Sequence, residues 1–204
     1  MPLDRRRIIL AFGAAAVAPL WPTPAWADRE PTPRMSEGPF YPRAFPADSD
    51  GDLTRLAGRN GVAQGEVLDV TGRIVDRSGA PRAGLRLEVW QCDATGHYHH
   101  VGQGEGDPGF QGFGAVTTDA EGGYRFRTIK PVPYPGRTPH IHFAVLEGGR
   151  RRLVSQMFIE GEPGNARDGL YRYLGESAKR VTMRLENAAS AGAKLRGSLD
   201  IVLG

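Results

Sequence analysis

The chain reads Leu85-Arg86-Leu87-Glu88-Val89-Trp90-Gln91 a little before the middle of its 204 residues. Apolar residues alternate here with mostly polar ones, which is the pattern of a β-strand that buries one face. The pattern ends at Cys92-Asp93-Ala94-Thr95-Gly96, a stretch typical of a turn. The sequence therefore predicts a half-buried strand that runs into a loop, and this loop carries His97-Tyr98-His99-His100.

Short strand-like segments continue on both sides of this stretch, separated by turn residues such as Ser78-Gly79 and Gly122-Gly123. They are Val67 to Val75, Ala115 to Thr118, Tyr124 to Ile129, His140 to Leu146, Leu153 to Ile159, Val181 to Leu185 and Leu199 to Leu203. Eight short strands without a long amphipathic helix predict an all-β fold, an antiparallel β-sandwich. The stretch from Gly102 to Gly114 has six glycines and no strand pattern, which predicts either a flexible connection or a long functional loop that follows Tyr98.

Length and composition fit one domain, since 40% hydrophobic residues suffice for one packed core. We assign the sandwich to residues 65–204. Residues 28–64 are rich in Pro, Asp and Arg and lack periodicity, so they predict an extended N-terminal arm with room for one short helix. Cys92 is the only cysteine, which excludes an intramolecular disulfide and favours a small apolar filler. The net charge of +3 falls to nearly zero without Arg5, Arg6 and Arg7, so no nucleic-acid partner is expected.

The N-terminus resembles an export signal. Arg5-Arg6-Arg7 precedes an apolar run from Ile8 to Leu20 and a small-x-small site at Ala25-Trp26-Ala27. We expect residues 1–27 to be a twin-arginine-type signal that delivers a folded protein to the periplasm or beyond. The run is short and prolines follow it, so we expect cleavage after Ala27 and no stable membrane insertion. An ordinary secretory signal and a retained anchor are the alternatives.

A second informative stretch lies downstream and reads Tyr134-Pro135-Gly136-Arg137-Thr138-Pro139-His140-Ile141-His142-Phe143. If the segment from His140 is extended, His140 and His142 project from the same face, about 7 Å apart at the backbone. That spacing suits two ligands of one metal ion, although a lone H-x-H also occurs as packed core residues.

Three segments in this order resemble the intradiol ring-cleavage dioxygenases, the family of catechol and protocatechuate dioxygenases. They are V-W-Q-C-D-A-T-G-H-Y (residues 89–98), D-A-E-G-G-Y-R-F-R-T-I (residues 119–129) and Y-P-G-R-T-P-H-I-H-F (residues 134–143). The segments at residues 36–42 and 155–158 are also similar, so the resemblance covers about residues 36–165. It implies a sandwich with non-haem Fe(III) among loops at its edge. It also implies a catechol-type substrate, opened by O2 between its two hydroxyl-bearing carbons to a cis,cis-muconate-type dicarboxylate.

Carried over residue by residue, the resemblance implies four iron ligands, Tyr98, Tyr134, His140 and His142. Anionic phenolate oxygens suit Fe(III), and a bound metal lowers the pKa of tyrosine from its usual value near 10. Tyr134 matches the tyrosinate that leaves the metal and acts as a base when substrate binds. Arg137 matches an arginine that stabilises charge on the substrate ring, and Gln156 matches a glutamine beside the active site.

The chain also departs from the better-known protocatechuate enzymes. The segment between Tyr134 and His140 is shorter here, and Pro135 stands where those enzymes have tryptophan. This short form resembles compact, exported members of the family. The sequence therefore does not disclose which catechol is cleaved, whether His97, His99 and His100 contact an anionic substrate or only solvent, or whether the chain forms a homo-oligomer or needs a sister subunit.

Two other classes of protein compete with this interpretation. A non-catalytic periplasmic β-sandwich could use the five histidines to handle copper, or could bind carbohydrate. A copper carrier would have softer ligands, and Met157 is the only candidate nearby. An extradiol dioxygenase would hold Fe(II) on two histidines and a carboxylate, but no acidic residue stands in a comparable position near His140.

Overall fold

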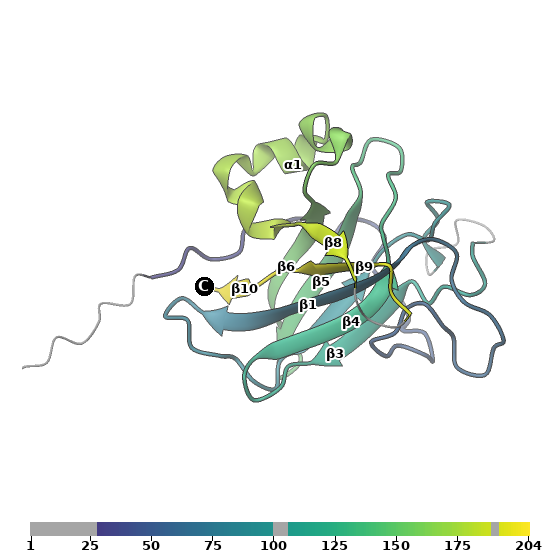
Figure 1. The fold of residues 1–204 in the computed structure, drawn as a ribbon. Helices are drawn as coiled ribbons and strands as arrows, with labels where there is room; N and C mark the ends of the chain where they lie inside the picture. Colours follow the sequence, from purple (N-terminus) through teal and green to yellow (C-terminus); the bar gives the residue numbers. More distant parts are fainter. Residues whose placement is uncertain (1–27, 100–105, 189–191) are drawn as a thin grey trace, which may run out of the picture.

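The computed structural model describes residues 28–99, 106–188 and 192–204. The predicted signal and His100 lie outside the described residues. Two five-stranded sheets pack against each other, and the main hydrophobic core lies between them (Figure 1). Leu68 and Val70 project into this core from one sheet, and Ile141 and Phe143 project into it from the other. The predicted β-sandwich is confirmed.

The first sheet contains β1, β4, β8, β9 and β10, and the second contains β2, β3, β5, β6 and β7. The bounds in the first are β1 Val67–Asp76, β4 Gly123–Ile129, β8 Leu185–Asn187, β9 Leu195–Ser198 and β10 Ile201–Leu203. Those in the second are β2 Arg86–Trp90, β3 Phe113–Thr117, β5 His140–Glu147, β6 Arg150–Ile159 and β7 Thr182–Met183. β5 lies in the middle of its sheet, antiparallel to both β2 and β6.

The structure differs from the predicted strands near the C-terminus. The segment predicted from Val181 to Leu185 divides into β7 and β8, which join different sheets on either side of exposed Arg184. β9 was not expected, because Leu195-Arg196-Gly197-Ser198 has a single large apolar residue. Most pairings are antiparallel as predicted, but β9 and β10 pair with β1 in parallel, and β7 pairs with β6 in parallel. These late strands reach their partners after long connections, so local alternation does not set their direction.

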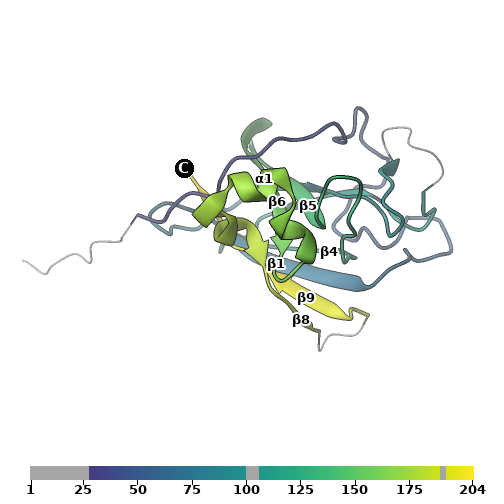
Figure 2. The same cartoon turned by 90° about the horizontal axis from the view of Figure 1, so that it is seen from above.

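A helical segment connects β6 to β7 and lies over one end of the sandwich (Figures 1 and 2). It consists of the 3-10 helix η2 Pro163–Ala166, the helix α1 Gly169–Tyr173 and the 3-10 helix η3 Gly175–Val181. Asp168 caps α1 with its side chain. No helix within the described ranges has the length and apolar character needed to cross a membrane.

The N-terminal arm is extended, and residues 28–64, all of which are described, contain no helix. Its backbone follows the second sheet and the C-terminus. Thr32 N–H donates to Val202, Met35 N–H donates to Val154, and Leu53 is fully buried in the core. This path places residues 36–41 over the outer face of β5 and β6, because Gln156 in β6 donates to the carbonyl of Ser36.

Candidate metal and substrate site

His140 and His142 lie on β5, and each side chain is only 1% exposed. They alternate with Ile141 and Phe143, which enter the core, so the imidazoles occupy the outer face of the sheet. Their Nε2 atoms are 3.1 Å apart. His140 Nδ1 lies 2.7 Å from the carbonyl oxygen of Thr138, which orients this ring, whereas the ring of His142 stacks on Trp90. Both Nε2 atoms therefore point to one position.

Tyr134 reaches the same position from the loop after β4. A tight turn folds it back, with Arg137 N–H donating to the carbonyl of Tyr134 at 2.9 Å. Gly136 has a φ of +81°, a conformation that favours glycine. Tyr134 Oη then lies 3.3 Å from His140 Nε2 and 3.4 Å from Arg137 Nη1.

Tyr98 approaches from the loop after β2 and is 4% exposed. Its ring lies 5.7 Å from that of Tyr134 and 6.1 Å from that of His142. The loop is held by Asp93, whose carboxylate accepts hydrogen bonds from the backbone of Thr95, His97 and Asp107. Tyr98 Oη and His142 Nδ1 are both buried, and neither has a hydrogen-bond partner among the described residues.

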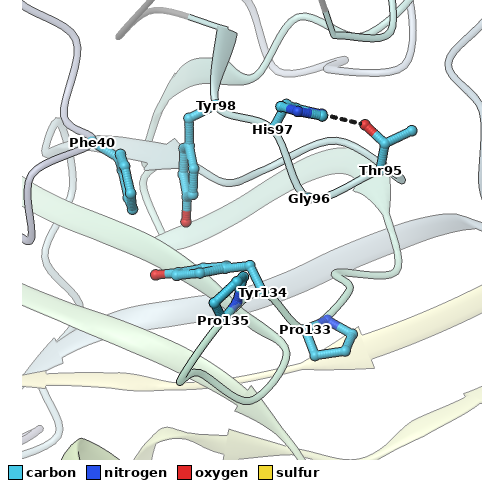
Figure 3. A pocket seen from close by; sticks show the side chains of 8 residues that line it. All are labelled: Phe40, Thr95, Gly96, His97, Tyr98, Pro133, Tyr134 and Pro135. Atoms are coloured by element: carbon cyan, nitrogen blue, oxygen red, sulfur yellow. Dashed lines mark hydrogen bonds between the residues drawn. The ribbon is translucent and has the colours of Figure 1, made fainter. Parts of the chain in front are cut away.

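A cavity of about 520 Å³ opens beside the two tyrosines, within the range of small-molecule sites. Its lining is Phe40, Thr95, Gly96, His97, Tyr98, Pro133, Tyr134 and Pro135. Figure 3 shows the rings of Phe40 and Tyr98 side by side, with Tyr134 across from them and His97 bonded to Thr95. Phe40 stacks on Tyr98 with a centroid distance of 4.2 Å, so the N-terminal arm forms one wall of the site.

Burial shapes the electrostatics of the four donors. It lowers the pKa of His140 to about 4, with a further contribution from the charge of Arg137, and it holds the pKa of His142 well below its ordinary value. Both imidazoles are therefore neutral at pH 7, with a lone pair available for a metal. Burial raises the pKa of both Tyr98 and Tyr134. Only a cation at the convergence point would make ionisation of these phenols favourable at neutral pH.

These four residues fit a hard, highly charged metal ion. Two neutral nitrogens and two phenol oxygens converge, and a buried Oη of Tyr98 without a partner is the atom that a cation would satisfy. Across the described ranges, no group of three or more His, Cys, Asp and Glu side chains forms a metal site. A donor set at this position would therefore have to include the tyrosines.

Arg137 and Gln156 also lie at the site, so the structure brings all six predicted residues together. Gln156 is fully buried in β6 opposite His142, and its Oε1 accepts a hydrogen bond from Arg137 Nη2. Arg137 Nε donates to Asp168 at 2.8 Å. Of the flanking histidines, His97 lines the cavity, whereas the Nε2 atom of His99 lies 3.0 Å from Asp93.

Four residues at the site were not expected from the sequence: Phe40, Trp90, Asp93 and Asp168. Asp93 stands in a turn pattern and Asp168 precedes a short helix, so each has a local signal as a turn or cap residue. No local signal connects Asp168 to Arg137, which lies 31 residues away in sequence. Phe40 comes from the arm, where the absence of periodicity concealed its packing.

Several known proteins are similar to this chain along most of its length. A family model described as "Dioxygenase" matches residues 36–204. The protocatechuate 3,4-dioxygenase beta chain of Burkholderia cepacia is 42% identical over 183 residues, which cover 83% of this chain and 78% of that one. Catechol 1,2-dioxygenase 2 of Acinetobacter lwoffii is 35% identical over 65% of this chain, and the match spans about half of that relative's length, 52%.

Solved structures with the same fold extend the comparison. The dioxygenase domain of a dioxygenase and carbohydrate-binding protein fusion from Streptomyces sp. SirexAA-E has a TM-score of 0.68 and 33% identity. The match covers 85% of this chain and 98% of that domain. Catechol 1,2-dioxygenase from Acinetobacter sp. ADP1 has a TM-score of 0.65 and 26% identity, with 84% of this chain and 62% of that one covered.

Proposed function

The chain belongs to the intradiol ring-cleavage dioxygenase family, and on that premise we propose that it is a non-haem Fe(III) dioxygenase acting on a catechol-type substrate. The reaction would insert both atoms of O2 between the two hydroxyl-bearing carbons and give a cis,cis-muconate-type dicarboxylate. One observation carries the proposal. His140 Nε2 lies 3.1 Å from His142 Nε2 and 3.3 Å from Tyr134 Oη, and the buried phenol of Tyr98 lines the adjacent cavity together with Tyr134.

His140, His142, Tyr98 and Tyr134 would hold the iron, which would supply the Lewis acidity that makes a bound catecholate reactive toward O2. The protein keeps the two imidazoles neutral by burial, so each presents a lone pair without losing a proton first. Phenolate oxygens are hard anionic donors and favour the trivalent ion.

The two tyrosines are proposed to have different tasks. Tyr98 is almost completely buried and is stacked on Phe40, which holds its ring in place. Tyr134 is only half-buried and begins a four-residue turn that ends at Arg137, whose Nη1 lies 3.4 Å from Tyr134 Oη. We assign Tyr134 Oη as the base that accepts one of the two protons a catechol must release on chelation.

Arg137 is proposed to stabilise the negative charge of the substrate ring. Its guanidinium cannot lose its proton at neutral pH, and Nη1 lies 3.4 Å from Tyr134 Oη, next to the position where a catecholate would bind. Gln156 limits the movement of Arg137 through the bond from Nη2. Phe40, Pro133 and Pro135 give the cavity apolar walls that would exclude water from an aromatic ring.

Protocatechuate is the first substrate to try, because the relative from Burkholderia cepacia is named for it. His97 is the residue of the described cavity lining that could contact an anionic substituent on the ring. We also propose that the protein works in the periplasm or outside the cell, exported in the folded state by the signal at residues 1–27. A copper-handling sandwich would not need two tyrosines beside its histidines.

The test combines the metal content, the visible spectrum and the product. Candidate catechols are added to the purified iron-loaded protein without oxygen, and a new long-wavelength band is expected for those that bind. Turnover under 18O2 should then place both labelled atoms in the ring-opened dicarboxylate. A yellow semialdehyde, the extradiol product, or incorporation of a single label would contradict the proposal.

A further inference from the structure

Asp168 joins the candidate site to the helical segment through a single buried carboxylate. It lies just before α1 and its side chain is fully buried. Its two oxygens have separate partners. Oδ1 accepts from the backbone N–H groups of Leu170 and Tyr171 at 2.9 and 3.0 Å, and Oδ2 accepts from Arg137 Nε at 2.8 Å and from Thr138 N–H at 2.9 Å.

We infer that Asp168 is a positioning residue, which holds the Arg137 guanidinium in the orientation that faces Tyr134 and the cavity. The inference rests on the proposed function, because it takes Arg137 as the group that stabilises the bound catecholate. Asp168 itself does not touch the proposed metal ligands and would act only through its neighbours.

The contacts of Arg137 explain why one carboxylate has this effect. A guanidinium is planar, so its direction is set once two of its edges are bonded. Asp168 binds Nε and Gln156 binds Nη2, which directs Nη1 toward Tyr134 Oη. The arginine side chain is 16% exposed, so solvent would replace a lost partner only in part. Without Asp168, the guanidinium would be free to rotate away from the substrate position.

The second hydrogen bond to Asp168 Oδ2 comes from Thr138, which in turn contacts His140. Thr138 N–H donates to Oδ2, and the carbonyl of Thr138 accepts from the Nδ1 side of His140 at 2.7 Å. The pairing of β5 with β2 and β6 also holds the two histidines, so this contact is not required for metal binding. The carboxylate is kept ionised. Burial alone would raise its pKa, but the hydrogen bonds from Tyr171, Thr138 and Arg137 outweigh burial, and the pKa lies below its ordinary value.

Two substitutions separate the positioning role from the capping of α1. Asp168→Ser keeps a strong N-cap residue but cannot reach Arg137, and Asp168→Asn keeps the shape but removes the charge. We expect both variants to bind iron as the parent does and to lose about 10- to 100-fold in kcat/KM, the size of loss produced when a group at the reacting centre is displaced by about 1 Å.

A double substitution shows whether Asp168 acts through Arg137. If it does, Arg137→Ala combined with Asp168→Ser should be no slower than Arg137→Ala alone, because the positioned group is already absent. Losses that multiply would overturn the inference. Asp69→Asn is the matched control, since Asp69 is a buried carboxylate paired with Arg125 and Arg127 on the other sheet. It should lower stability and leave kcat/KM unchanged, and an equal loss of kcat/KM in this control would show that the Asp168 effect is general destabilisation.

An NMR measurement that does not require catalytic turnover distinguishes failure of this inference from failure of the proposed function. In the metal-free protein, the Nε–H of Arg137 should give an NMR signal that exchanges slowly with solvent and is identified by its loss in Arg137→Lys. Asp168→Ser should make this signal exchange rapidly. If the parent cleaves no catechol but the signal behaves in this way, the proposed function is wrong and the positioning stands. If the signal is unchanged in Asp168→Ser, the inference is wrong whatever the turnover.

Discussion

Tyr98 and Tyr134 have the same phenol in different surroundings. Tyr98 lies beneath Phe40, and its buried Oη makes no hydrogen bond to the described residues. Tyr134 is half-buried, with His140 on one side and Arg137 on the other. The charge of Arg137 favours the ionised form of Tyr134, whereas Tyr98 lies farther from any compensating charge. At the scale of single residues, the proposed roles therefore assign the fixed ligand to the more buried phenol and the exchangeable ligand to the phenol beside Arg137.

Tyr134→Phe tests this difference. We expect the variant to retain iron and part of its visible colour, which Tyr98 would still supply, but to form the catecholate complex slowly and turn over poorly. The reason is the loss of the base that accepts one catechol proton. Anaerobic stopped-flow mixing with a catechol measures the effect. Normal binding kinetics in Tyr134→Phe, together with slow binding in Tyr98→Phe, would show that the two roles are reversed.

Arg137→Ala should keep iron and colour yet lose most of its turnover. A charge-assisted contact made mainly in the transition state contributes about 2 to 4 kcal/mol, so kcat should fall roughly a hundredfold or more. Steady-state kinetics at matched iron content would measure it. Arg125→Ala is the control, because Arg125 is an exposed arginine paired with Asp69 on the other sheet. Activity equal to that of the parent in Arg137→Ala would make Arg137 a purely structural residue.

At the scale of elements, β5 supplies two donors and the loops after β2 and β4 supply one each. β5 holds its two histidines firmly because it is hydrogen-bonded to a strand on each side. The loop after β2 has no such ladder and depends on Asp93, which is fully buried. Its carboxylate accepts hydrogen bonds from backbone on both sides of Tyr98, from Thr95 and His97 before it and from Asp107 after it. The Asp93 side chain therefore contributes to the position of Tyr98, together with the stacking of Phe40.

Asp93→Ala should weaken this loop at neutral pH. Several backbone N–H groups would lose their acceptor, and leaving buried donors unsatisfied costs about 1 to 3 kcal/mol. We expect a lower Tm and a weaker contribution of Tyr98 to the visible spectrum. Thermal denaturation and absorption spectra of the iron-loaded variant measure the two effects. A normal spectrum would show that the loop holds Tyr98 without Asp93.

The contribution of Asp93 should also depend on pH. Burial would raise its pKa, but hydrogen bonds from Thr95, Asp107 and His97 outweigh burial and hold the pKa well below its ordinary value. A carboxyl with a lowered folded-state pKa stabilises the fold above its unfolded pKa of about 3.9, and this contribution is lost as the pH falls below that value. The difference in Tm between the parent and Asp93→Asn should therefore be constant from pH 7 to 5 and shrink below pH 4. A difference that already shrinks near pH 6 would point to a different group.

At the scale of the whole molecule, the site and the main core lie on opposite faces of the second sheet. Ile141 and Phe143 face the core between the sheets, while His140 and His142 face the arm and the loops. Phe40 of the arm forms one wall of the cavity. Backbone hydrogen bonds to β6 and β10 hold the arm in place. The sandwich should therefore fold without metal, and metal should stabilise mainly the loops and the arm.

Purified protein is expected to contain about one iron per chain and to be red to burgundy, because phenolate-to-Fe(III) charge transfer absorbs visible light. Removing the iron with a chelator should abolish the colour and lower the Tm, since a ligand that binds only the folded state stabilises it. The far-UV CD spectrum should change little. Colourless protein that is fully occupied by zinc or copper after growth with ample iron would contradict the iron assignment.

The sequence by itself determined the sandwich and the shared face of His140 and His142, and its resemblance to the family indicated the six residues now found together. Alternation is a local signal that reports which face of a strand is buried. Tertiary structure alone decided the parallel pairing of β7, β9 and β10, the stacking of Phe40 on Tyr98, and the bond between Asp168 and Arg137. Each of these joins segments distant in the chain, and such contacts depend on the packing of the whole molecule, which no short stretch of sequence encodes.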